Sequence, residues 1–201
     1  MIKSLLASAA ATAAVFASAH AVEIKSTFDT DTEGFVLSGG DLAQLPSGVL
    51  QATDTIGTEM MLTLPSKFIL PLSIGDSLSF DARETKNPDG DFGGFGEVTI
   101  SNGTDSLTKD FFTGDLMDEW ITVDVAFDGA SWDTTDVFLA GILSGLTSIV
   151  INVESGSDIS EVVLIDNVIL TTTAVPVPAA ALLFAPLAGV AALSRRRQRK
   201  H

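Results

Sequence analysis

Hydrophobic and polar positions alternate in short runs through the middle of the chain, and turn-forming residues separate these runs. Alternation with a period of two is typical of strands that bury one face, and a series of such strands is typical of an all-β sandwich or barrel. In the clearest run, 120–127, the predicted core face is Ile121, Val123, Val125 and Phe127. The predicted strands are Ile24–Phe28, Gly34–Leu37, Val49–Thr53, Glu59–Leu64, Ser77–Ala82, Glu97–Ser101, Leu107–Phe111, Trp120–Phe127, Ser148–Glu154 and Val162–Leu170.

One segment of the middle stretch shows a helical period instead. Its stripe consists of Val137, Phe138, Gly141, Ile142, Gly145 and Leu146. Asp133, Thr134 and Thr135 can cap the start of a helix, and Asp136 suits its first turn. We therefore predict a short helix over Thr135–Leu146.

The first 21 residues have the three-part pattern of a secretory signal. Lys3 precedes a run rich in Ala and Leu, and Ala19, His20 and Ala21 form a cleavage site of the A-x-A type. We expect residues 1–21 to form a signal helix that is removed on export. Cleavage after Ala21 would leave Val22 as the first residue of the mature chain.

The last 27 residues combine a Pro-containing motif, an uncharged stretch and a basic cluster. The motif is Val175, Pro176, Val177, Pro178 and Ala179, and the cluster is Arg195, Arg196, Arg197, Arg199 and Lys200. Residues 175–193 are numerous enough to span the hydrocarbon core as a helix. The positive-inside rule assigns the basic cluster to the cytoplasm. We expect a transmembrane helix that anchors the acidic middle outside the inner membrane.

These three parts, in this order, resemble the PEP-CTERM class of bacterial sorting signals, in its VPLPA variant, with Val177 in place of Leu. The resemblance implies a Gram-negative bacterium that makes extracellular polysaccharide. It also implies processing by an exosortase, a membrane transpeptidase that releases or re-anchors the protein. The expected location is the cell surface or the extracellular space, with transient or permanent anchoring by the C-terminal helix.

Charge and composition exclude several classes of function. The sequence has 26 acidic residues against 11 Lys and Arg, for a net charge of -15. All 26 acids lie within 22–174 with only five cations, so this stretch has a net charge of -21. Such acidity argues against nucleic acid as a partner, because phosphates require cationic side chains.

Cys and Tyr are absent, and both His residues, His20 and His201, are terminal. The middle stretch therefore lacks the thiol nucleophile, the commonest general base and the commonest zinc ligand.

Six fragments of residues 22–174, in order, resemble the laminin IV type A domain, also called laminin B, in its bacterial versions. They are Phe28-Asp29 with Glu33-Gly34-Phe35, then Leu78–Arg83, Trp120, Trp132, Thr147–Ile151 and Leu164–Leu170. The resemblance implies one jelly-roll β-sandwich of the galactose-binding-like kind, an architecture used by carbohydrate modules.

Calcium is the metal that this resemblance implies. Jelly-roll modules of this kind often hold a structural Ca²⁺ where the first and last strands meet, and the matching residues here are Asp29 and Asp166. Carboxylates are ligands that Ca²⁺ prefers. The alternative is that Asp29 caps a turn and Asp166 bonds locally. A second acidic segment, 87–94, departs from the EF-hand pattern at Phe92 and Val98, which favours a Gly-rich hairpin or flexible loop.

We assign no catalytic residue. Glycosidases need two carboxylates in different protonation states, but a chance pair is expected among 26 acids. The E-x-D-x-x-E spacing of jelly-roll glucanases is absent. Trp120 and Trp132 are predicted to pack in the core or at an edge.

The favoured function is non-catalytic binding of a polysaccharide or another extracellular component. The alternatives are an acid-only polysaccharide-degrading enzyme and a structural coat protein without a specific ligand.

Overall fold

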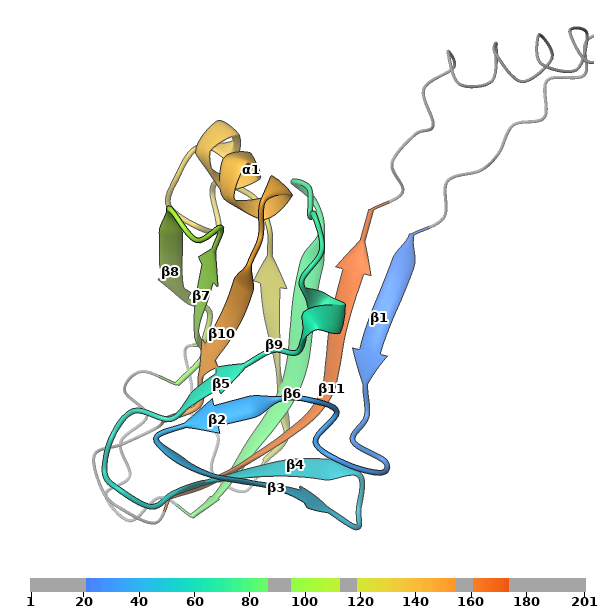
Figure 1. The fold of residues 1–201 in the computed structure, drawn as a ribbon, viewed down its shortest axis with the longest axis vertical. Helices are drawn as coiled ribbons and strands as arrows, with labels where there is room; N and C mark the ends of the chain where they lie inside the picture. Colours follow the sequence, from blue (N-terminus) through green and yellow to red (C-terminus); the bar gives the residue numbers. More distant parts are fainter. Residues whose placement is uncertain (1–20, 87–94, 113–118, 155–160, 174–201) are drawn as a thin grey trace, which may run out of the picture. The chain divides into compact units, whose positions relative to one another are not determined.

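The strands are arranged in two antiparallel sheets (Figure 1). A computed structural model describes residues 21–86, 95–112, 119–154 and 161–173. Within these ranges, sheet A consists of β1 (Val22–Ser26), β3 (Gly40–Leu45), β4 (Val49–Asp54), β6 (Ser77–Lys86), β9 (Ile121–Ala126) and β11 (Val162–Thr172). Sheet B consists of β2 (Val36–Ser38), β5 (Met61–Thr63), β7 (Glu97–Ser101), β8 (Ser106–Asp110) and β10 (Ser148–Asn152). A 3-10 helix at Ser66–Phe68 and the α-helix α1 at Asp136–Ser144 complete the described secondary structure.

Strand β11 is the centre of sheet A. One of its edges pairs with β6, and the other pairs first with β4 and then with β1. The register with β6 shifts between Asp166 and Ile169, where Asn167 adopts a φ of 48°. This β-bulge inserts one extra residue, so Val168 again points into the core although it follows Ile165 by three positions. Because a one-residue shift reverses which face a side chain points to, the bulge keeps both halves of β11 in one core.

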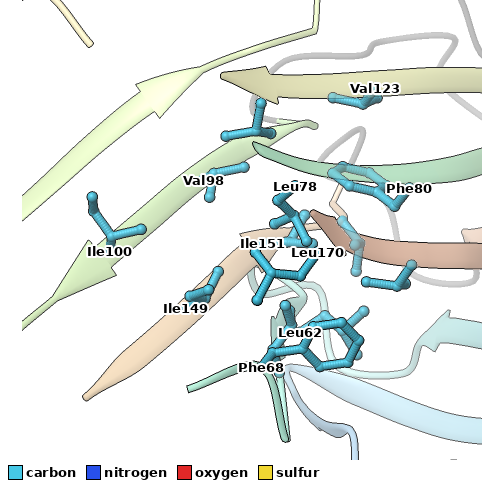
Figure 2. Packing of buried hydrophobic residues seen from close by; sticks show 14 of the residues in the cluster. Leu62, Phe68, Leu78, Phe80, Val98, Ile100, Val123, Ile149, Ile151 and Leu170 are labelled. Carbon is cyan, nitrogen blue, oxygen red and sulfur yellow. The ribbon is translucent and has the colours of Figure 1, made fainter. Parts of the chain in front are cut away.

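The two sheets bury their apolar faces against each other. Figure 2 shows side chains of both sheets meeting in this core, among them Leu78 and Phe80 of β6 and Ile149 and Ile151 of β10. The alternate residues of the same strands point to the outside of the sandwich. The outward faces of the sheets are therefore the broad surfaces on which a ligand can be bound.

The structure confirms the predicted all-β jelly-roll sandwich with one short helix. Each of the ten predicted strands overlaps an observed one, and Glu97–Ser101 has the predicted bounds. The sequence did not predict β3, which among the described strands pairs with β4 at the edge of sheet A and whose residues are all at least partly exposed. A strand at such an edge buries too little surface to need a strict apolar alternation.

The predicted helix is confirmed, but its predicted stripe is wrong in part. Thr135 is the N-cap, and its side chain accepts a hydrogen bond from the backbone N–H of Phe138 (3.3 Å). The helical residues that face the core are Leu139, Ile142 and Leu143. Val137 and Phe138, which belong to the predicted stripe, are exposed instead.

Several predicted segments lie outside the described residues. They are the signal helix apart from Ala21, the acidic segment 87–94, and the whole of residues 174–201 with the sorting motif, the apolar stretch and the basic cluster. In the part of the chain that the structure describes, no helix is long and apolar enough to cross a membrane.

Candidate functional site

The outward face of sheet A carries a row of side chains across three strands. Leu164 of β11 pairs with Gln51 of β4 on one side and with Arg83 of β6 on the other. Trp120 directly precedes β9, and continuing the β9 alternation by one residue puts it on the same outward side as Thr122. Neighbours in such a row have Cβ atoms about 5 Å apart.

Trp120 is accessible to a ligand and directly precedes the edge strand β9. The side chain is 44% exposed, whereas Trp132 is 3% exposed. The indole N–H of Trp132 donates to the backbone carbonyl of Ala126 (3.0 Å), and its ring packs against Phe111 and Phe127. Trp132 therefore has the predicted packing role, while Trp120 at the edge has a large surface left for a partner.

The next row on the same face holds a fixed carboxylate. Asp81 of β6 pairs with Asp166 of β11 and with Thr122 of β9. One carboxylate oxygen of Asp81 accepts a hydrogen bond from the hydroxyl of Thr122 (2.6 Å), and the other accepts one from the side-chain amide of Asn167 (2.8 Å). These bonds hold the carboxylate in one orientation. We call the surface formed by the two rows the Trp120 face; its members are Gln51, Asp81, Arg83, Trp120, Thr122, Leu164 and Asp166.

Asp29 and Asp166, the predicted calcium ligands, belong to different elements. Asp29 follows β1 and accepts a hydrogen bond from the Thr27 hydroxyl (2.7 Å), while Asp166 accepts one from the backbone N–H of Asn167 (2.6 Å). Burial raises the pKa of Asp166, and the negative charges of Asp81 and Asp29 raise this pKa further. The two predicted ligands are thus close enough to repel each other.

The described residues do not by themselves complete a metal site. In the described ranges, no three Asp, Glu, His or Cys side chains are grouped so that they could hold a metal ion. A Ca²⁺ ion takes six to eight oxygen ligands, so Asp29 and Asp166 would supply only part of the set. Backbone carbonyls and water would have to provide the others.

The segment before Asp29 is held in place by Glu33. The Glu33 carboxylate accepts hydrogen bonds from the backbone N–H groups of Phe28 (2.8 Å) and Thr27 (3.2 Å), and it forms an ion pair with Lys67. The rings of Phe28 and Phe35 pack edge to face with centroids 5.1 Å apart. This explains why the fragment that resembles the laminin IV opening combines two aromatic residues with an acid.

The outward face of sheet B has a different character. A row across four strands consists of Thr63, Val150, Thr99 and Thr108, and the hydroxyls of Thr99 and Thr108 are 2.7 Å apart. Among the strand residues that the structure describes, this outward face carries no aromatic side chain. The exposed Trp120 distinguishes the face of sheet A as the better candidate for a ligand.

A group of buried acids was not found from the sequence, because its members are far apart along the chain. Asp54, Glu154 and Glu161 are all nearly or completely inaccessible to solvent. Glu154 accepts a hydrogen bond from the backbone N–H of Met60 (3.1 Å). Burial, with the nearby charges of Glu161 and Asp54, raises the pKa of Glu154 to about 7. Carboxylates closed to solvent in this way are not available to a polysaccharide substrate.

Comparison with known proteins identifies the fold. No family model and no curated protein matches the sequence. The L4b domain of human laminin alpha-2 has a TM-score of 0.52 at 13% identity, covering 71% of this chain and 84% of that domain. A mutant of a family 29 carbohydrate-binding module has a TM-score of 0.50 at 15% identity, covering 76% of this chain and 87% of that module. The CBM22-1 xylan-binding domain from Paenibacillus barcinonensis has a TM-score of 0.50 at 11% identity, covering 76% of this chain and 95% of that domain.

These likenesses are at low sequence identity and show a shared architecture. The chain has the jelly-roll β-sandwich that a laminin domain and carbohydrate-binding modules also have, in agreement with the expected laminin-IV-like fold.

The buried acids predict that stability depends on pH. The folded-state pKa of Glu154, about 7, is above its ordinary value of 4.5, so between these pH values the folded chain binds a proton that the unfolded chain lacks. The contribution of Glu154 to stability is therefore present at low pH and is lost as the pH rises through about 7. We expect the melting temperature to fall between about pH 5 and about pH 8.

The variant Glu154→Gln keeps an acceptor for the Met60 N–H and cannot ionise. Its melting temperature should depend less on pH over this window, whereas Glu23→Gln, which changes an exposed acid of β1, should behave like the wild type. If the melting temperatures of all three proteins depended equally on pH, the assignment of this pH dependence to Glu154 would be wrong.

Proposed function

We propose that this chain is an exported bacterial protein of the cell surface or matrix whose β-sandwich is a non-catalytic module that binds polysaccharide through the Trp120 face. The observation that carries the proposal is the exposed indole of Trp120, which directly precedes β9 at the edge of the sheet face that carries Gln51 and Asp81. A fold shared with carbohydrate-binding modules supports it.

The residues of the Trp120 face suit a sugar chain. The faces of pyranose rings carry C–H groups that pack against a flat aromatic surface, and a Trp side chain offers the largest such surface with little loss of conformational entropy. Around the ring, sugar hydroxyls need donors and acceptors. The Gln51 amide donates to the Thr53 hydroxyl (3.1 Å) and has a second N–H as a donor, and each Asp81 oxygen, held by Thr122 or Asn167, has a further lone pair as an acceptor. A ligand lying across the strands would meet both rows.

The same groups argue for binding rather than turnover. Hydrolysis requires one carboxylic acid that donates a proton and one carboxylate that activates water or attacks the sugar. Glu154 has the raised pKa of an acid, but it is buried with Asp54 and Glu161. The alternative functions are an acid-only enzyme and a coat protein without a specific ligand. The next experiment distinguishes both from polysaccharide binding.

Removal of the indole tests the binding face. In affinity electrophoresis through gels containing xylan, mannan or the exopolysaccharide of the producing bacterium, at least one polymer should retard the wild-type protein. Trp120→Ala should weaken that retardation at least about tenfold, equivalent to about 1.4 kcal/mol. Ile56→Ala, which removes another exposed apolar side chain, should leave it unchanged. Retardation by no polymer would favour the coat protein, and shortening of the polymer would favour the enzyme.

The proposal of export and sorting rests on the sequences of the two ends of the chain. Residues 1–21 would direct export, and residues 175–201 would hold the chain in the inner membrane until an exosortase-type enzyme processes the motif from Val175 to Ala179. Intact-mass spectrometry of the protein isolated from cells should show Val22 as the first residue and, after processing, loss of the basic cluster. A mass that includes residues 1–21 would contradict export by this signal.

We also propose that Asp29 and Asp166 bind a structural Ca²⁺, which would relieve their mutual repulsion. Because a ligand that binds only the folded state stabilises it, a chelator should lower the melting temperature by several degrees, and added Ca²⁺ should restore it. The double variant Asp29→Asn with Asp166→Asn should not respond, while Asp105→Asn, in the turn between β7 and β8, should respond like the wild type. An unchanged wild-type midpoint would rule out the site.

A further inference from the structure

The first turn of α1 presents apolar side chains to solvent. Val137 is 84% exposed and Phe138 is 45% exposed. A Cβ atom added at Gly141, one turn further along the helix, would meet nothing within 4 Å. These three residues, which we call the α1 tip, contribute nothing to the core. Adjacent exposed apolar side chains on a helix are typical of a surface that a partner covers.

The α1 tip lies at the end of the sandwich at which β11, the last described strand, ends. Figure 1 shows α1 at the same end at which β1 begins and β11 ends. The backbone N–H of Leu72 donates to the carbonyl of Leu143 in α1 (3.0 Å), so the loop before β6 is tied directly to the helix.

Asp76 ties the end of β11 to the same loop. Its buried carboxylate accepts hydrogen bonds from the backbone N–H (2.6 Å) and the hydroxyl (2.8 Å) of Thr173, and its other oxygen accepts one from the N–H of Ser73 (2.7 Å). The last described residue of the domain is therefore fixed relative to α1. The chain is therefore held in place as far as Thr173.

The apolar stretch of the tail begins almost at once. Val175 follows Thr173 by two residues, which span at most about 7 Å when extended. The headgroup layer on each side of a bilayer is about 5–8 Å thick, as the difference between the whole membrane and its hydrocarbon core. If residues 175–193 span a bilayer, Thr173 lies at or close to the headgroup layer, and Thr173 belongs to the end of the sandwich that carries α1 (Figure 1).

The charges near the α1 tip are compatible with such a contact. The carboxylate of Asp136 accepts a hydrogen bond from the backbone N–H of Gly129 (2.6 Å), and Asp133 forms an ion pair with Lys109. The acids closest to the tip are thus engaged within the protein. Since residues 22–174 carry a net charge of -21, attraction to anionic lipid cannot hold the domain at a membrane. Burial of apolar side chains is the remaining source of affinity.

We propose that the α1 tip is a lipid contact, in which Val137 and Phe138 enter the interfacial layer of the bilayer that holds the C-terminal segment. The inference rests on the proposed membrane anchoring of residues 175–193. It gives the anchored domain a defined orientation, with α1 against the membrane and the β4–β5 loop away from it (Figure 1).

Depth-dependent fluorescence quenching tests the orientation in the full chain. The protein is reconstituted into phosphatidylcholine vesicles with and without brominated acyl chains. Phe138→Trp places an indole at the tip, and Ile56→Trp places one at an exposed position of the β4–β5 loop. Trp120 and Trp132 of the wild-type chain provide the background. We expect brominated lipid to quench the added emission of Phe138→Trp at least twofold, and that of Ile56→Trp not at all.

The outcomes separate this inference from the proposed anchoring. Vesicle flotation reports whether the chain is anchored, and thermal melting confirms that each variant is folded. If the chain floats with the vesicles but Phe138→Trp is quenched no more than Ile56→Trp, the lipid contact is wrong and the anchor stands. If the chain does not float, both the anchoring and the lipid contact are overturned.

Discussion

The structure depends on the backbone of β11, which pairs with three other strands. Its first half joins β4, its second half joins β1, and β6 runs along the opposite edge. The bulge at Asn167 makes this possible, because it lets Val163 and Ile165 face the core before the bulge and Val168 and Leu170 after it. Without the extra residue, the second half of β11 would point its apolar side chains to solvent.

The same strand determines the surface on which we place the ligand. When β11 buries alternate residues, it presents Leu164 outward between Gln51 of β4 and Arg83 of β6, and Asp166 outward beside Asp81 of β6. Asp81 in turn pairs with Thr122 of the edge strand β9, which Trp120 directly precedes. Asn167 also donates to Asp81, so the bulge that preserves the core helps to orient a carboxylate of the Trp120 face. Core packing and the candidate site therefore have a common origin.

Much of the acidity of the chain has a structural use. The carboxylates of Glu33, Asp54, Asp76 and Asp136 each accept hydrogen bonds from backbone N–H groups in loops, where a short acidic side chain can replace a missing strand partner. Such acids are fixed in orientation and contribute little to chemistry. This is why the abundance of carboxylates does not indicate an enzyme, and why an exposed aromatic side chain is the more informative feature.

The sequence by itself determined the class of fold and most of its strands, because alternation reports directly which residues a strand must bury. It also limited the cap of α1 to Asp133, Thr134 or Thr135, because capping depends only on neighbouring residues, and the structure shows that Thr135 is the cap. Only the tertiary structure decided which side of α1 is buried, that Trp120 is exposed while Trp132 is buried, and that Asp54, Glu154 and Glu161 come together. Each of these three features depends on which distant segment packs alongside the residues concerned. The local pattern of a strand does not specify which strands become its neighbours in the sheet.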